Sequence, residues 1–245
     1  IAQAVSAALV MGKLLMTREI YRVRLGEICF DRKMIRRIVD IGLPAAIQQS
    51  ITSFSNVIVQ SYINYFGTAA MAGYSATLRV DGFLQLPLQS FNMTITTFVG
   101  QNIGAKEYKR VKKGIFTSWL MCSGIILVGS VIMFLKAPSI IGIFTEDAAV
   151  ISVGSSMIRI FGSAYLFLPI IQILNGALRG AGRSKVPMYF MLGCFVLLRQ
   201  IYLMIAVPMT KNVSVVFAGW PVTWVVCAIG MLVYYFKVDW LPKEE

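Results

Sequence analysis

The sequence predicts an all-α integral membrane protein built as a bundle of six transmembrane helices. Three observations lead to this fold class: the chain is 57% hydrophobic, its mean hydropathy is +0.72, and its apolar residues gather in long stretches. A helix rising ~1.5 Å per residue needs about 20 such residues to cross a ~30 Å hydrocarbon core. Strands of a membrane barrel would be about half as long and would alternate polar with apolar residues.

Six complete spans are expected along the chain. In order, they cover residues 41–65, 80–103, 114–135, 157–178, 186–208 and 214–236. Residues 1–16 are apolar but too short to cross, and we expect them to be the end of a preceding transmembrane helix. The domain organisation that follows is a cytoplasmic linker at 17–40, a helical bundle at 41–237 and a cytoplasmic tail at 238–245.

Proline occurs at two kinds of position in these spans. Pro44 and Pro187 stand where spans begin, and there the missing N–H costs little. Pro87, Pro169 and Pro221 stand inside spans, where each removes a helix hydrogen bond and favours a kink. Kinked helices are typical of transporters that move during their cycle, and bends that only improve packing are the alternative.

Lys and Arg residues alternate between crowded and sparse loops, which sets the orientation. The crowded loops and the tail carry Arg18, Arg22, Arg24, Arg32, Lys33, Arg36, Arg37, Lys106, Lys109, Arg110, Lys112, Lys113, Arg179, Arg183, Lys185, Lys237 and Lys243. The sparse loops carry Arg79, Lys136 and Lys211. The crowded loops and the tail are therefore expected to be cytoplasmic. Placed beside the lipid bilayer in this way, the net charge of +12 does not indicate nucleic-acid binding.

Residue composition argues against catalysis. The sequence has no His, which excludes histidine-based catalysis, proton relay and metal binding. Cys122, Cys194 and Cys227 fall inside spans and Cys29 in a cytoplasmic loop, so they form neither a disulfide framework nor a metal-ligand spacing. No Ser or Cys nucleophile stands beside a base, and no glycine-rich phosphate loop follows a strand. We expect no enzyme activity, no cofactor and no metal site.

Polar side chains form a narrow stripe on each of the first two spans. The stripe on 41–65 contains Gln49, Ser53, Asn56 and Gln60, with Thr52 and Asn64 beside it. The stripe on 80–103 contains Asp81, Gln85, Gln89, Asn92 and Thr96. Steps of three and four residues keep each set on one helix face. Such residues can be interhelical hydrogen-bond partners, but two coherent lines of them favour a water-filled substrate cleft.

Two cytoplasmic helix ends share a Gly-x-x-x-Gly pattern followed by small and basic residues. They are GQNIGAKEYKR at 100–110 and NGALRGAGRSK at 175–185. Gly100 with Gly104, and Gly176 with Gly180, are predicted to let helix backbones approach closely. Gly104 and Gly182 are also candidates for the left-handed residue that ends a helix.

One basic residue, Arg199, lies in the middle of a span. A charge at that depth costs ~2.5–3.5 kcal/mol on insertion scales, so its side chain should face the bundle interior and find a partner. Asp81 has a similar depth and is the one carboxylate within a complete span. We therefore predict a buried Arg199–Asp81 charge pair, with a substrate-binding or gating role for these residues as the alternative.

Three segments occur together along the chain: IGLPAAIQQSITSFSNVIVQSYINYFGTAAMAGYSATLRVDGF, GQNIGAKEYKR and ALRGAGRSKVPM. In this order and spacing, residues 30–240 resemble the second half of a multidrug and toxic compound extrusion (MATE) transporter. The resemblance implies a twelve-helix antiporter of two six-helix lobes in the plasma membrane, which exports cationic or amphipathic drugs and toxic compounds against entering Na⁺ or H⁺. This chain would be the carboxy-terminal lobe, 17–40 the inter-lobe linker, and the amino-terminal lobe its partner.

The sequence departs from that family at the coupling site. Some branches place an acidic cation ligand in the first helix of this lobe, whereas the polar residues at 48–53 are amides and hydroxyls. No carboxylate lies between Arg159 and Arg179 either. We therefore expect the coupling ion, Na⁺ or H⁺, to bind in the amino-terminal lobe. A lipid-linked saccharide flippase of related architecture is the alternative, and more charge within the helices would be expected of it.

Overall fold

The computed structural model describes residues 2–19, 22–24, 26, 30–210 and 212–241, and at positions 2, 37 and 41 it describes the backbone alone. Cys29, Lys211, Lys243 and the Arg37 side chain lie outside the described residues. The chain forms two compact units, Ile1–Val39 and Asp40–Glu245. In the described part of both units, the regular structure is helical.

The first unit contains helix α1 (Ala2–Met16) and the first turns of α2 (Arg32–Asn64). Asp31 caps α2, because its Oδ1 accepts a hydrogen bond from the Lys33 N–H at 2.8 Å. The predicted linker is therefore helical over its last residues, and α2 begins nine residues before the span expected at 41.

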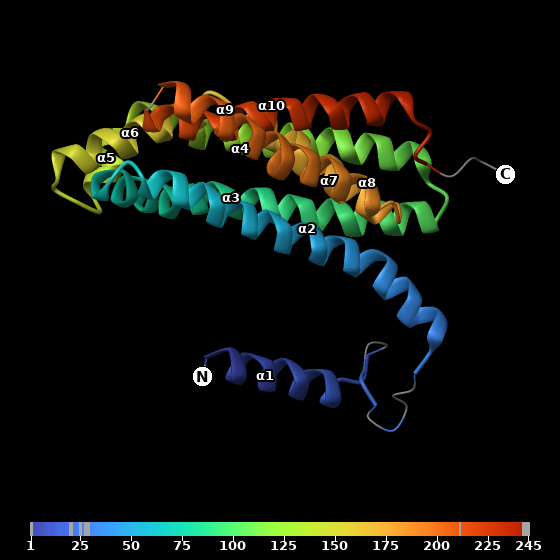
Figure 1. The fold of residues 1–245 in the computed structure, drawn as a ribbon. Coiled ribbons are helices and arrows are strands. Elements are labelled where there is room, and N and C mark those ends of the chain that lie inside the picture. The colour runs from blue at the N-terminus through green and yellow to red at the C-terminus, as the bar shows by residue number, and fades with distance from the viewer. Residues whose placement is uncertain (1, 20–21, 25, 27–29, 211, 242–245) are drawn as a thin grey trace. The chain divides into compact units, whose positions relative to one another are not determined.

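The second unit is a bundle of helices (Figure 1). After α2 the elements are α3 (Thr68–Gly104), α4 (Tyr108–Leu135), α5 (Ala137–Gly142), α6 (Ala148–Gly162), α7 (Phe167–Gly180), α8 (Lys185–Met191), the π-helix η2 (Leu192–Leu198), α9 (Arg199–Thr210) and α10 (Val213–Lys237). Side-chain caps begin two of them. Asp147 accepts from the Ala149 N–H before α6, and Asn212 accepts from the Ser214 N–H before α10.

Three helices of the described chain are long and apolar enough to cross a membrane: α4, the continuous α8–η2–α9 helix and α10. They agree with the spans predicted at 114–135, 186–208 and 214–236. The span predicted at 157–178 consists of two helices, because α6 and α7 meet at a bend of 59° close to Pro169, where the sequence predicts a kink, and together they make a fourth candidate span. α2 and α3 are longer than predicted, and their polar stripes make them less apolar than α4 and α10.

Proline accounts for part of the difference between the predicted spans and the observed helices. Pro169 lies in the first turn of α7, where it begins a helix but has no N–H to continue the hydrogen bonds of α6. Pro87 and Pro221 lie inside α3 and α10, as predicted. Pro44 lies inside α2 and not at a helix start, because α2 begins earlier than expected. Pro208 is a further interior proline, in α9.

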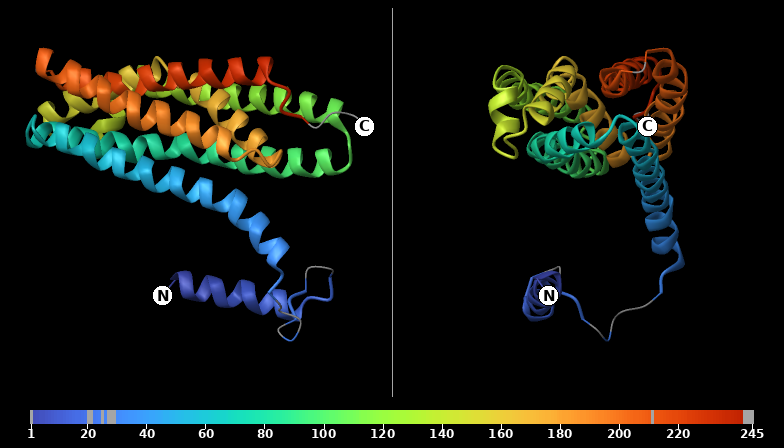
Figure 2. Two further views of the ribbon diagram at one scale, coloured as in Figure 1. Left: turned by 45° about the vertical axis from the view of Figure 1, so that its right-hand side comes forward. Right: turned by 60° about the vertical axis from the view of Figure 1, so that its left-hand side comes forward.

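The interior of the second unit is centred on α7. This helix packs against α3, α4 and α10, and Figure 2 shows α4, α5 and α6 on one side of the bundle and α9 and α10 on the other. Aromatic rings fill the core beside the α6–α7 bend. The Phe161 ring centroid lies 5.3 Å from that of Trp220 and 5.2 Å from that of Trp224, which lies 5.6 Å from Tyr165. Two charged side chains lie beside these rings, one buried and one half-buried.

Candidate functional site

The first of these side chains is Arg199, at the start of α9, which is only 3% exposed. Its guanidinium donates to the Asn56 side-chain oxygen of α2 and to the Thr223 hydroxyl of α10, each at 3.2 Å. The same group lies over two rings, 5.3 Å from the centroid of Phe195 and 5.0 Å from that of Trp220. Neutral oxygens and π-faces therefore take the place of a carboxylate around this cation.

The second is Asp81 of α3, which is half-buried. Its carboxylate accepts a hydrogen bond from the Tyr165 hydroxyl at 2.6 Å and one from the Gln85 amide at 3.2 Å. Tyr165 stands in the turn between α6 and α7, so the bend in this span is what directs its hydroxyl to α3. A carboxylate has about four lone-pair sites, and these two donors leave capacity for a proton or another cation.

The hydrogen bonds of Arg199 and Asp81 do not support the direct charge pair that similar depth predicted. Arg199 bonds to α2 and α10, and Asp81 bonds to its own helix and to Tyr165. The ring centroid of Tyr74, also on α3, is 6.0 Å from that of Trp220, the ring that lies under Arg199. Each charge is stabilised by neutral partners, and aromatic rings connect them. We call Tyr74, Asp81, Tyr165, Arg199 and Trp220 the charge cluster.

The stripe predicted on α2 divides into two parts. Gln49 and Ser53 are exposed on the surface of this chain. Asn56 is exposed as well but also bonds to Arg199 on α9, and the half-buried Gln60 bonds to the Asn64 side chain of its own helix at 3.0 Å. One residue of the stripe, Asn56, therefore makes an interhelical hydrogen bond, while Gln49 and Ser53 face outward from the bundle.

The stripe on α3 divides in the same way. Gln89 is exposed, while Gln85 is bound to Asp81. Asn92 donates to the main-chain oxygen of Gln172 on α7 at 2.7 Å and to its side-chain oxygen at 3.2 Å. Both of the expected roles thus occur along one helix: hydrogen bonding between helices at one turn and open polar surface at the next.

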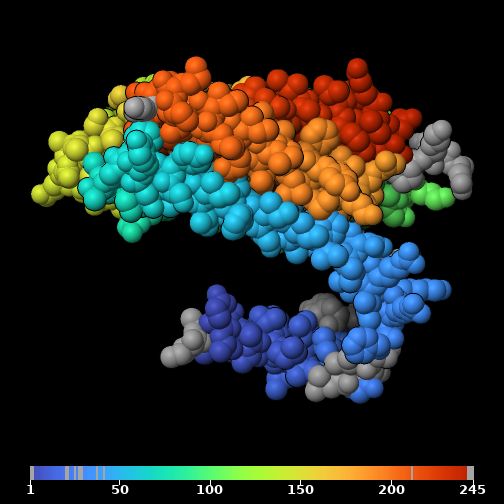
Figure 3. Space-filling model, viewed as in Figure 1, coloured from blue at the N-terminus to red at the C-terminus, as the bar shows by residue number. Residues whose placement is uncertain are grey.

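A polar contact that the stripes did not predict joins α2 to the π-helix. The Ser55 hydroxyl, fully buried, donates to the Phe195 carbonyl at 3.1 Å and accepts from the Gln200 amide at 2.9 Å. A π-helix shifts the backbone register, and Ser55 satisfies one of its carbonyl groups. Figure 3 shows α2 and the α8–η2–α9 helix side by side along this face.

The predicted glycines differ in what surrounds them. A Cβ at Gly176 would lie 2.6 Å from the Asn92 carbonyl oxygen of α3, and one at Gly180 would overlap the Thr96 carbonyl oxygen. Thus α7 meets α3 as closely as predicted at these two positions. A Cβ at Gly100 would make an ordinary contact at 3.5 Å, and one at Gly104 would meet nothing within 4 Å. The close approach therefore depends on the second pair alone.

The helix ends also differ from one another. Gly182, after α7, has the left-handed conformation that the sequence suggested, with φ of 77°. After α3 the left-handed residue is Lys106, with φ of 59°, and not Gly104, which remains helical.

Within the part of the chain that the structure describes, no group of three or more His, Cys, Asp or Glu residues could hold a metal ion.

Apolar spanning helices, one of them bent, around a buried arginine and a half-buried aspartate define a helical membrane protein of the transporter class. The MatE family profile matches residues 44–205. A probable multidrug resistance protein of Bacillus subtilis (strain 168), YoeA, is 24% identical over 161 residues, which are 64% of this chain and 34% of YoeA. The probable multidrug resistance protein NorM of Thermotoga maritima is 28% identical over 171 residues, 70% of this chain and 37% of NorM. This chain belongs to the MatE family.

Solved structures agree on the fold. A crystal structure of MATE in the straight conformation matches with a TM-score of 0.88 and 18% identity, over 97% of this chain and 54% of its own. An outward-facing MATE family transporter of the MOP superfamily gives a TM-score of 0.87 at the same identity. The chain therefore spans about a third of its curated relatives and about half of these structures. The second unit is one six-helix lobe of that twelve-helix fold, made of α2, α3, α4, the bent α6–α7 pair, α8–η2–α9 and α10.

Proposed function

We propose that this chain is the carboxy-terminal lobe of a cation-coupled antiporter that exports cationic or amphipathic drugs and toxic compounds by alternating access. The observation that carries the proposal is the exposed polar surface of α2 and α3, formed by Gln49, Ser53 and Gln89. Amide groups placed against hydrocarbon would lose their hydrogen bonds to water, at a cost of several kcal/mol each. A wet cleft against a second lobe removes that cost.

The names of the relatives support the class of cargo. YoeA and the Thermotoga NorM are named as probable multidrug resistance proteins, and MepA of Staphylococcus aureus as a multidrug export protein. This chain corresponds to about a third of each relative. We therefore propose, beyond this chain, an amino-terminal lobe that binds the coupling ion and completes the cargo pocket. In this proposal, Na⁺ or H⁺ binds in the amino-terminal lobe.

Asp81 is the residue of this lobe that we assign to a cationic cargo. It lies on the α3 stripe, is held in place by Tyr165 and Gln85, and retains acceptor capacity. Arg199 has the opposite sign, but its contacts with Phe195 and Trp220 cover it within the core. A cation that reaches the cleft would meet the carboxylate and the exposed amides before it met the arginine.

The orientation in the proposal follows from the basic residues. Most of the Lys and Arg residues lie in the loops after α1, α3 and α7, in the helix turns that flank these loops, and at the end of α10, which supports a cytoplasmic position for these ends at the plasma membrane. The carboxy-terminus is then cytoplasmic. A protease site added after residue 245 should be cleaved in inverted vesicles and not in right-side-out vesicles.

The test of the function uses the full-length transporter that contains this chain. Reconstituted into proteoliposomes, it should move ethidium against its gradient when a Na⁺ or H⁺ gradient is imposed, and dissipating that gradient should stop transport. A lipid-linked saccharide flippase would instead translocate a fluorescent polyprenyl-linked sugar and leave ethidium in place. Dye movement that persists equally without either ion gradient would contradict coupled antiport.

A further inference from the structure

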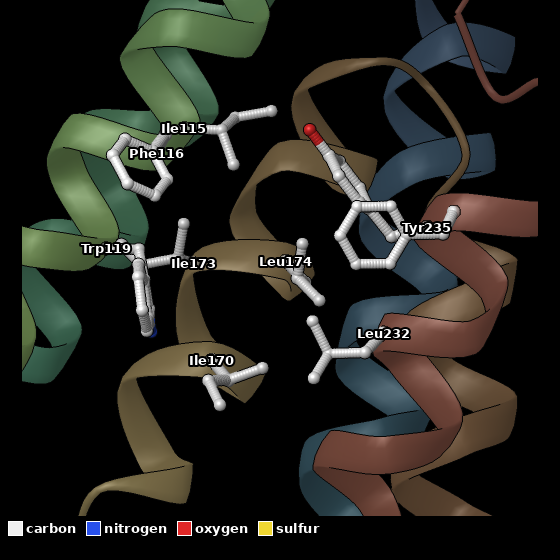
Figure 4. Close-up of a pocket in the computed structure, with 9 residues that line it drawn as sticks. Ile115, Phe116, Trp119, Ile170, Ile173, Leu174, Leu232 and Tyr235 are labelled. Atoms are coloured by element: carbon white, nitrogen blue, oxygen red, sulfur yellow. The ribbon is translucent and has the colours of Figure 1, made fainter.

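A groove runs over α7 between α4 and α10, away from the helices that carry the polar stripes (Figure 4). It encloses a volume of about 370 Å³, within the range of small-molecule sites. Its lining side chains are aliphatic and aromatic, and they include Phe116 and Trp119 of α4, Ile173 of α7, and Leu232 and Tyr235 of α10. Such a lining suits a hydrocarbon chain. It suits a cationic cargo, which we assign to the carboxylate of Asp81, less well.

The rim of the groove faces outward while its floor is buried. Phe116 is 61% exposed and Phe236 is 78% exposed, whereas Ile173 on α7 is 1% exposed. In a membrane-spanning lobe, large apolar side chains with this exposure are covered by lipid tails. The groove is therefore an opening in the lipid-facing surface, into which a chain from the bilayer can enter sideways.

Basic residues stand where a lipid headgroup would lie. Lys112 precedes Phe116 by one turn and Trp119 by two, so all three share one face of α4. At ~1.5 Å per residue, Lys112 lies about 6 Å and about 10 Å from these side chains along the helix. Lys237, at the end of α10, follows Phe236 directly. Both lysines are exposed. They form a charged end of the groove, next to its apolar cavity.

One polar atom inside the lining also points to a ligand. The Trp119 indole nitrogen is buried and has no hydrogen-bond partner in the described part of the chain. A buried N–H without an acceptor costs about 1–3 kcal/mol. Tyr235 brings a second polar tip to the lining. Trp and Tyr are the residues that proteins place at headgroup depth, where ester carbonyls of lipids supply acceptors.

We propose that the groove binds an anionic phospholipid, with one acyl chain in the cavity, its phosphate at Lys112 and Lys237, and an ester oxygen at the Trp119 N–H. The cytoplasmic leaflet is its source, a point that rests on the proposed orientation. Headgroup charge distinguishes this lipid from a zwitterionic one, because each basic residue near a membrane surface contributes ~1 kcal/mol of attraction to anionic lipid.

The test is native mass spectrometry of the full-length transporter in micelles that contain equal amounts of phosphatidylglycerol and phosphatidylcholine. Wild type should retain phosphatidylglycerol in preference. The double variant Lys112→Gln/Lys237→Gln should lower that preference about 30-fold, since two contributions of ~1 kcal/mol correspond to that ratio. Lys136→Gln, an exposed lysine at the other end of α4, is the matched control and should change nothing.

A second pair of variants tests the cavity itself. Leu232→Trp fills the groove and should release both lipids, whereas Leu127→Trp, on an exposed face of α4, should retain them. Retention of phosphatidylglycerol by both the charge variant and the filled variant would overturn the proposal. Displacement by inorganic phosphate alone would make this a phosphate site, and displacement by ethidium would make it a cargo site; either result overturns the lipid assignment. None of these readouts needs transport, so they stand apart from the proposed function.

Discussion

The contact between α3 and α7 gives the prediction with the clearest magnitude. At Gly176, a Cβ would lie 2.5 Å from the Ile95 side chain and 2.6 Å from the Asn92 carbonyl oxygen. Ordinary carbon–oxygen contacts begin near 3.3 Å, so Gly176→Ala requires the two helices to separate by about 0.7 Å. Separation of packed elements costs ~1–3 kcal/mol, and the better helix propensity of alanine offsets about 1 kcal/mol of this. We therefore expect a net loss of up to about 2 kcal/mol, which is a loss of about 1–3 kcal/mol relative to a helical glycine-to-alanine change that meets no neighbour.

The control variants come from the same chain. Gly104→Ala and Gly124→Ala place a Cβ where nothing lies within 4 Å, and both glycines are helical. They should leave the stability of the full-length transporter unchanged or raise it slightly. The assay is the midpoint of thermal aggregation in detergent, followed by fluorescence-detected size exclusion. If Gly176→Ala is as stable as Gly104→Ala, α3 and α7 do not approach within the 2.6 Å of a Cβ at Gly176.

Three further predictions concern the charge cluster and its surroundings. The double variant Arg199→Met/Asp81→Asn should show a coupling energy below ~1 kcal/mol in stability, because the two side chains have separate partners; a coupling of ~3–5 kcal/mol would restore the direct pair. Asp81→Asn alone should keep a near-normal folded yield and lower efflux of cationic dyes at least tenfold relative to a neutral amphipathic dye, and equal efflux of both would remove its cargo role. Ser55→Ala should cost about 1–2 kcal/mol of thermal stability, since it leaves the Phe195 carbonyl and the Gln200 amide without this partner, while Ser61→Ala on the exposed face of α2 should cost little.

Hydropathy and charge were sufficient to predict the helical membrane fold, because both depend on local composition. Pro169 predicted a kink in the span at 157–178, but the apolar run through Ser163 and Tyr165 gave neither the position of the α6–α7 break nor its 59° angle. For the same reason, the residue that reaches Asp81 was missed. A hydroxyl in an apolar stretch gives no sign of its partner on another helix.

The depth of a charged residue is readable from a single sequence, but its lateral position in the bundle is not. The sequence gives Arg199 and Asp81 a similar depth, but it does not show that Arg199 lies over the Trp220 ring or that Tyr74 packs against the same ring. The residues of the two polar stripes lie within the helices α2 and α3. Their division into hydrogen-bonded and exposed turns depends on the packing of α7 and α9, which no pattern within α2 or α3 contains.

The central claim is that the exposed polar residues of α2 and α3 face water in the assembled transporter, and thiol accessibility measures this directly. Single cysteines at Ser53 and Gln89 of the full-length protein should react with a membrane-impermeant maleimide, because water allows the thiolate to form. A cysteine at Val128, which is 61% exposed on α4 but covered by lipid, should stay unmodified. Added cargo should slow the reaction at Ser53 and Gln89. Equal protection of all three cysteines would contradict a wet cleft and assign the stripes to packing.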